Sequence, residues 1–196
     1  MASKCKFFYG GQALSPKGKA NFVYINTRVN VIQGEEKGYG ITLEFPKKET
    51  KELQDSFLKL FEEKKQTEEC KELVWQGDPY PGYSEDADGN PVFKLKSNRQ
   101  DKNGKWEKIP LVDSKNNPLP LDTNIGSGSI VRAIYTPAVY WVNKKNFGVT
   151  LFLDKLQVLD LKTFSSGVNR STVEFPEEDG YVASVDFPVS EEEDPF

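Results

Sequence analysis

The sequence lacks histidine altogether and contains only two cysteines, Cys5 and Cys70, among 196 residues. Histidine is the side chain that most often acts as a general base near neutral pH, so its absence excludes Ser-His-Asp and Cys-His catalytic arrangements. Two cysteines without histidine do not complete a usual zinc site, and they are too few for a disulfide framework. Any catalysis would therefore have to use carboxylates, lysine or tyrosine, which makes an enzyme less expected without excluding one. No metal or cofactor is expected.

Long apolar runs are also absent. No segment approaches the roughly 20 apolar residues that cross a membrane, and the N-terminal stretch MASKCKFFYGGQA lacks the apolar run of a signal peptide. The scarcity of cysteine fits a reducing compartment. We expect a soluble, intracellular protein with one compact domain.

Charge is distributed unevenly along the chain. Residues 171–196 carry nine acidic residues and no lysine or arginine, whereas residues 1–170 carry all 26 basic residues and 21 acidic ones, a net charge of +5. This asymmetry predicts a polyanion-binding domain over residues 1–170 and an acidic C-terminal tail over residues 171–196 that mimics or repels the polyanion. The alternative is a solubility tail on an ordinary domain.

Strand patterns dominate residues 1–170. FVYINTRVNVI (22–32) and GYGITLEF (38–45) alternate and are rich in β-branched and aromatic residues, which indicates strands. Asn103-Gly104 predicts a hairpin between residues 92–99 and 105–113, and residues 129–142 and 147–164 form a second one, with Pro137 at an edge or a bulge. The fold class is mainly β, and closure into a small barrel would remove the sheet edges.

Only one segment has helical spacing. Leu53, Phe57, Leu60 and Phe61 recur at that spacing within residues 49–73, which predicts one amphipathic helix. The Gly- and Pro-rich residues 76–91 form a loop. That loop matches the start of a calcium-binding pattern, but Leu95 stands where a bidentate glutamate is needed, so we predict a turn and no metal site.

Aromatic residues make up 12% of the chain, and several accompany basic residues in the predicted strands. Unpaired bases stack on such rings while lysine and arginine hold phosphates, so these segments predict a platform for single-stranded nucleic acid. The alternative is that individual rings belong to the core. Phe22 lies beside Tyr24 in this pattern. The candidate DNA-binding residues are Lys94, Lys96, Arg99, Trp106, Arg132, Tyr135, Tyr140, Trp141, Arg28 and Tyr24.

The chain ends in SEEEDPF. A tethered polyanion competes with nucleic acid for a cationic groove, and an aromatic end offers an apolar anchor to a protein partner. The candidate partner-binding residues are Glu191, Glu192, Glu193, Asp194 and Phe196.

Several motifs occur together in order: TLEFPKKET, FKLK, LVDSKNNPLP, GSGSIVRAIYTPAVYWVNKKNFGVTLFLDKLQVLDLKTF, GYVAS and an acidic end with a final phenylalanine. Over residues 20–185 and the tail, this set resembles the single-stranded DNA-binding proteins of short-tailed coliphages and their relatives in other tailed phages. Pro195 and a shorter, less acidic tail depart from that family pattern.

The resemblance implies an OB-fold, a five-stranded barrel with one helix, and no enzymatic activity. It implies a protein that binds single-stranded DNA independently of sequence and acts in phage DNA replication, recombination and repair, in the cytoplasm of the bacterial host. It carries the basic strand onto Lys94 and Lys96, and an aromatic pair onto Tyr140 and Trp141. It also implies tail contacts with the replicative polymerase and primase-helicase, and a homodimer. The alternatives are a protein-binding OB scaffold and a metal-dependent nuclease that uses Asp86 and Asp88.

Overall fold

A computed structural model describes residues 5–163 of the chain, and the statements below concern those residues. The tail, residues 171–196, and all of its candidate partner-binding residues lie outside the described residues. Within the described residues, no helix is long and apolar enough to span a membrane.

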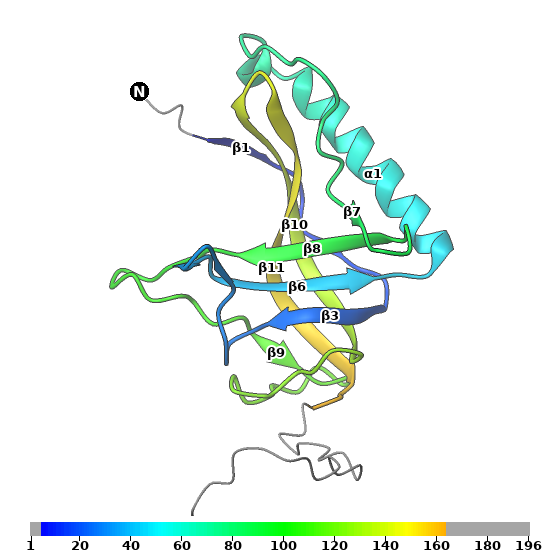
Figure 1. Ribbon diagram of the computed structural model, residues 1–196, viewed down its shortest axis with the longest axis vertical. Helices are drawn as coiled ribbons and strands as arrows, with labels where there is room; N and C mark the ends of the chain where they lie inside the picture. The colour runs from blue at the N-terminus through cyan, green and yellow to red at the C-terminus, as the bar shows by residue number, and fades with distance from the viewer. Residues whose placement is uncertain (1–4, 164–196) are drawn as a thin grey trace, which may run out of the picture. The chain divides into compact units, whose positions relative to one another are not determined.

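The described residues form a mainly β fold with one α-helix, as predicted (Figure 1). The elements are β1 (Lys6–Tyr9), β2 (Ala13–Leu14), β3 (Gly18–Tyr24), β4 (Val31–Ile32), β5 (Glu35–Glu36), β6 (Tyr39–Glu44), α1 (Lys47–Lys65), a short 3-10 helix η1 (Glu68–Cys70), β7 (Ser84–Glu85), β8 (Pro91–Ser97), β9 (Leu111–Val112), β10 (Ile130–Asn143) and β11 (Asn146–Asp160).

Five strands follow one another around a ring in the order β3, β6, β8, β11, β10 and back to β3. The joins are antiparallel except for the parallel join of β8 to β11. That join has two residue pairs, as does the join of β10 to β3, so the ring is not closed as a regular barrel. A partly open five-stranded barrel is the architecture of OB-folds.

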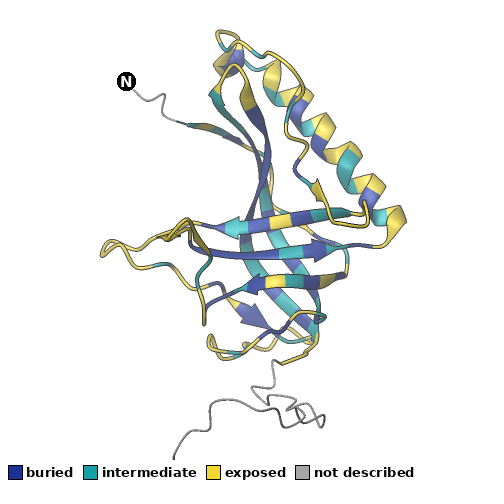
Figure 2. Cartoon of the chain, in the orientation of Figure 1, coloured by how far each residue is buried: buried dark blue, intermediate teal, exposed yellow. Residues whose placement is uncertain are grey.

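The core lies inside this ring, and α1 packs beside it. Alternation turns Ile41, Leu43, Phe93 and Leu95 inward, so the residues between them face outward (Figure 2). Phe57 lies on the buried face of α1, and its side chain is 6.1 Å from that of Phe93, measured between aromatic centroids. The helix therefore packs against the core that the strands enclose.

The helix is shorter than the periodicity predicts. It ends at Lys65 rather than near residue 73, and Thr67 adopts an extended backbone. The Thr67 hydroxyl donates a hydrogen bond of 2.7 Å to the Lys64 carbonyl oxygen. This side-chain bond competes with continued helix formation.

The strand expected over residues 22–32 is broken after Tyr24. Asn26 adopts a left-handed conformation with φ of 53°, and its side chain is buried. Its amide group donates to the Ile109 carbonyl oxygen at 2.8 Å and accepts from the Ile109 N–H at 2.7 Å. This side-chain pairing with a distant backbone replaces the strand ladder at that point.

The first predicted hairpin is correct in its turn but wrong in its second arm. Gly104 has the expected positive φ, 78°, yet the arms pair only next to the turn, through the bridge between Gln100 and Trp106 and the hydrogen bond from the Glu107 N–H to the Arg99 carbonyl oxygen at 3.0 Å. Leu111–Val112 pairs in parallel with β11 instead.

The second predicted hairpin is confirmed as β10 and β11. Pro137 is at neither an edge nor a bulge, because it pairs with Leu151 in regular register. On the other side of Pro137 lies the segment that connects β1 to β2. There the Gly10 N–H donates a hydrogen bond of 2.8 Å to the Pro137 carbonyl oxygen.

Candidate nucleic-acid interface

The outer face of β3, β6 and β8 carries polar and aromatic side chains in register. Lys94 pairs with Thr42, and Lys96 pairs with Gly40, which itself pairs with Tyr24 of β3. Across the parallel join, Lys96 pairs with Phe152 of β11. These strands lie side by side in Figure 1, so a row of outward positions crosses the sheet from β3 to β11.

One hollow of about 250 Å³ opens on this face. Its lining contains one cation, Lys94, and no carboxylate, and it includes the rings of Phe22 and Tyr24. The Arg28 guanidinium lies 4.9 Å from the centroid of the Tyr24 ring, a cation–π contact, and it also donates to the Val23 carbonyl oxygen at 3.0 Å. We call this space the first hollow; its lining residues are Phe22, Tyr24, Asn30, Ile32, Gly40, Ile41, Thr42 and Lys94.

A second hollow of about 510 Å³ adjoins the first and shares Phe22, Thr42 and Lys94 with it. Its charge differs, because four carboxylates line it together with two lysines. The carboxylates are those of Glu44, Glu85, Asp86 and Asp88. Phosphate groups are therefore disfavoured in the second hollow and favoured in the first.

On the far side of Lys96 the face continues into an aromatic cluster, Phe7, Tyr9 and Phe152. The Phe152 ring lies 5.5 Å from the Phe7 ring and 5.8 Å from the Tyr9 ring. The Lys96 ammonium lies 5.8 Å from the centroid of Phe152. Burial lowers the pKa of Lys96, and the neighbouring charge of Lys94 lowers it further. A phosphate anion beside these two lysines would offset both effects.

Tyr140 borders this cluster. It lies on β10 opposite Phe7 and is half-buried. Burial raises the pKa of its hydroxyl, with smaller contributions from Tyr80 and Cys5. Among the predicted residues, the structure thus brings together Lys94, Lys96, Tyr24, Arg28 and Tyr140.

Three other predicted residues are engaged elsewhere. The Arg99 guanidinium forms an ion pair with Asp154 of β11. The indole N–H of Trp106 donates to a Glu36 carboxylate oxygen at 2.7 Å, and the indole N–H of Trp141 donates to the Val74 carbonyl oxygen at 3.1 Å. Both indoles also pack against the core, so these contacts stabilise the local structure.

Tyr135, which the sequence predicts to bind DNA, is buried in the core. Its side chain is only 4% exposed, its ring lies 6.3 Å from Phe57, and burial raises the pKa of its hydroxyl to about 12. A ring in the core has no face open to a base. The inward position of Tyr135 follows from the alternation of β10, which also buries Ala133.

Arg132 is on a different part of the ring from Lys94. It points outward from β10 and lines hollows formed with Lys17 and Leu14, which share no residue with the two hollows above. The structure therefore does not bring Arg132 together with the basic strand β8.

Sequence reasoning missed the aromatic cluster. Phe7 and Tyr9 alternate with the buried Phe8 in KFFY, which is a period-2 signal, but the segment is only four residues long. Phe152 lies within a run of buried residues in β11, so its outward position has no local signal. Only the register of β11 against β8 places it beside Lys96.

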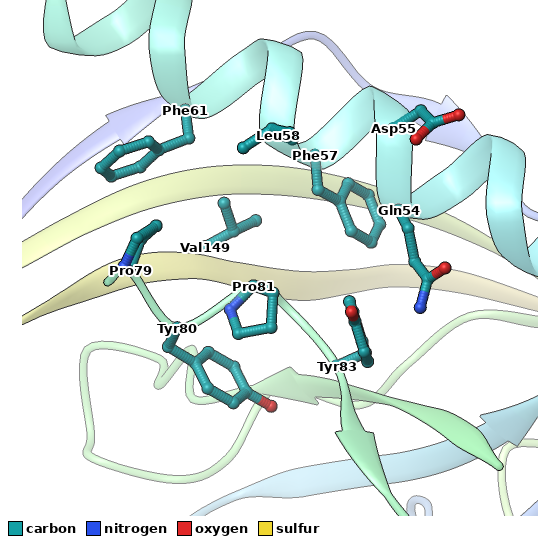
Figure 3. Close-up of a pocket in the computed structure, with 10 residues that line it drawn as sticks. All are labelled: Gln54, Asp55, Phe57, Leu58, Phe61, Pro79, Tyr80, Pro81, Tyr83 and Val149. Carbon is teal, nitrogen blue, oxygen red and sulfur yellow. The ribbon is translucent and has the colours of Figure 1, made fainter. Parts of the chain in front are cut away.

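Another cavity, of about 390 Å³, lies between α1 and the loop through Pro79 and Pro81 (Figure 3). Apolar and aromatic side chains, among them Phe57 and Leu58, form most of its lining, and its one charged residue is Asp55. Because the lining contains no lysine or arginine, this cavity does not suit a phosphate backbone.

The calcium-like segment forms a turn, as predicted. The Asp86 carboxylate accepts hydrogen bonds from the backbone N–H groups of Asp88 and Asn90, at 2.9 and 2.8 Å. No cluster of three or more metal-ligating side chains occurs within residues 5–163.

Known proteins resemble this chain in sequence and in structure. No family model matches the chain. Over 115 residues the chain is 31% identical to the single-stranded DNA-binding protein of Enterobacteria phage T3, a match that covers 54% of this chain and half of the T3 protein. The crystal structure of gp2.5, a single-stranded DNA-binding protein of bacteriophage T7, superposes with a TM-score of 0.61 at 28% identity, covering 92% of this chain and 100% of the T7 chain.

The chain is similar to phage single-stranded DNA-binding proteins. This confirms the resemblance drawn from the motifs. A second structure, the single-stranded DNA-binding protein of bacteriophage Enc34 in complex with ssDNA, has a TM-score of 0.51 at 17% identity and covers 78% of this chain and 86% of that one, which supports the fold alone.

Proposed function

We propose that this chain binds single-stranded DNA without sequence preference through the outer face of β3, β6 and β8. The observation that carries the proposal is that Lys94 and Lys96 project two residues apart from β8, with aromatic rings on either side of them. Lysines hold phosphates by salt-sensitive attraction, and rings stack on bases. Every base has a π-face, so stacking on this surface does not select a sequence.

The similar proteins from phages T3 and T7 are named as single-stranded DNA-binding proteins, which supports a binding protein rather than an enzyme. The alternative of a nuclease centred on Asp86 and Asp88 loses its basis, because the Asp86 carboxylate is engaged by the backbone of its own turn.

The biological setting is part of the proposal and rests on the resemblance. The protein would act in phage DNA replication, recombination and repair, in the cytoplasm of the bacterial host. Polymerase and primase-helicase would be recruited through the acidic residues 191–194 and Phe196, and a homodimer would form. The uneven charge of the sequence supports a role for the tail that is separate from the described domain.

A titration of the full-length protein with oligothymidylate of about 30 nucleotides, at about 50 and about 200 mM salt, tests the proposal. We expect the fluorescence anisotropy of a labelled oligonucleotide to rise on binding, with an affinity that falls with salt. Removal of residues 187–196 should tighten binding if the tail competes with DNA. If the full-length protein left both the anisotropy and the electrophoretic mobility of the labelled oligonucleotide unchanged, the protein-binding scaffold would be favoured instead.

A further inference from the structure

Phe22 has a backbone conformation that large side chains rarely adopt. Its φ is 47°, in the left-handed region, although it lies within strand β3. For a bulky aromatic residue in a strand this is a true outlier, and such outliers persist only where the surroundings enforce them. They concentrate at binding sites.

The cause is an irregularity in the pairing of β3 with β6. Asn21 pairs with Thr42, and the next paired residue is Tyr24, opposite Gly40. Phe22 and Val23 therefore have no Cα partner on β6. Val23 turns inward, where it is 4% exposed, and Phe22 turns outward, where it is 70% exposed.

The outward ring contributes little to the core. Val23 fills the buried position, and no ring contact of Phe22 with another aromatic side chain of the described residues is found. Exposing an aromatic ring of this size to water is unfavourable, as is the positive φ. Neither cost is offset by packing inside the domain, so an external ligand is the natural explanation.

The position of Phe22 indicates what that ligand contacts. Phe22 stands between the two hollows and lines both, together with Thr42 and Lys94. The first hollow offers the Tyr24 ring and Lys94 without a carboxylate, whereas the second is lined by four carboxylates. A base with its phosphate suits the first hollow and is repelled from the second.

We propose that Phe22 stacks on a base held in the first hollow and marks one end of the single-strand path, which then runs past Lys94 and Lys96 to the aromatic cluster, where the Tyr9 ring is exposed. This inference rests on the proposed function and assigns a particular residue and a boundary to it. The strain at Phe22 keeps the ring exposed in the free protein, so that it is already in position when DNA arrives.

Substitution of Phe22 by glycine should change the stability of the protein and its affinity for DNA in opposite directions. Phe22→Gly removes the ring and the penalty of positive φ together, since glycine adopts this conformation readily. We expect a melting temperature equal to or above that of the wild type and an affinity for oligothymidylate reduced about tenfold, with an unchanged salt dependence. Phe22→Trp keeps a stacking ring and should bind within about threefold of the wild type.

Leu121→Gly is the matched control, because Leu121 is an exposed apolar side chain that lines neither hollow. Its affinity for DNA should equal that of the wild type. Wild-type affinity in Phe22→Gly would overturn the stacking role while leaving the proposed function intact. A fall in melting temperature together with affinity would show that Phe22 is a structural residue instead. Failure of the wild-type protein itself to bind would remove the proposed function first.

Discussion

The Lys96 ammonium lies 5.8 Å from the centroid of the Phe152 ring, across the parallel join between β8 and β11. The pair combines a group that binds phosphate with a ring that lies against Phe7 and Tyr9. Since the two residues are far apart in the sequence, this combination exists only because β11 returns beside β8.

Lys94→Ala and Lys96→Ala should each reduce the salt dependence of binding. One lost phosphate contact lowers the slope of log affinity against log salt by about 0.7 for a single strand. The slopes are measured with oligothymidylate over a series of salt concentrations. Lys51→Ala, on the exposed side of α1, is the control and should keep the wild-type slope. Equal slopes in all three variants would remove β8 from the phosphate path.

Tyr9→Ala should weaken binding without this change in slope. The Tyr9 ring is exposed and uncharged, so its loss removes a stacking surface worth about 1–3 kcal/mol and leaves the phosphate contacts in place. Fluorescence titration measures the affinity, and thermal melting verifies that the fold persists. An affinity equal to that of the wild type would restrict the binding face to the first hollow and the two lysines.

Arg99→Ala should change stability more than affinity. Arg99 is paired with Asp154, whose carboxylate also accepts hydrogen bonds from the Thr136 hydroxyl at 2.7 Å and the Gln12 amide at 3.1 Å. Because Arg99 is exposed, the expected destabilisation is small, at most about 1 kcal/mol. DNA affinity should stay within about twofold. A large loss of affinity, with a reduced salt slope, would return Arg99 to the phosphate-binding set.

Asp154→Ala complements that variant. It leaves the Thr136 hydroxyl and the Gln12 amide without their acceptor, so a larger loss of stability than for Arg99→Ala is expected, about 1–3 kcal/mol. Chemical denaturation of the two variants gives the comparison. If Arg99→Ala were the more destabilising of the two, the ion pair itself would be the dominant contribution.

Stability should decrease in acid because of three similar turns. Asp86, Asp101 and Asp113 each begin a five-residue turn in which the carboxylate accepts backbone N–H groups two and four residues further on, at 2.8–2.9 Å. The largest cause of the lowered pKa is the backbone N–H four residues on for Asp86 and Asp101, and the Asn117 side-chain amide for Asp113.

A folded-state pKa below the unfolded value means that the stabilisation is complete above the unfolded pKa, about 3.9, and is lost as the pH falls through the folded value. Urea denaturation at pH 7 and at a pH below the unfolded aspartate pKa of about 3.9 measures this loss. Asp113→Asn removes one titrating group and should flatten the dependence. An identical pH profile in this variant would show that its turn does not contribute.

Local patterns were sufficient for part of the structure. Alternation in GYGITLEF predicted β6, and the long apolar segments around NKKN predicted β10 and β11, because period-2 alternation and turn residues act over a few neighbouring positions. Alternation within β8 also places Lys94 and Lys96 on one face. Boundaries depended on distant contacts, as the pairing of Asn26 with Ile109 shows.

The sequence by itself therefore determined the mainly β class, the basic strand β8 and the likeness to phage single-stranded DNA-binding proteins, since periodicity, charge and motif order are written in neighbouring residues. Only the tertiary structure decided which rings face solvent. Tyr135 is buried and Phe22 is exposed, although both are aromatic residues in strands beside basic ones. Strand register and the irregularity in β3 decide this, because one extra residue on a strand moves the following side chains from one face of a sheet to the other.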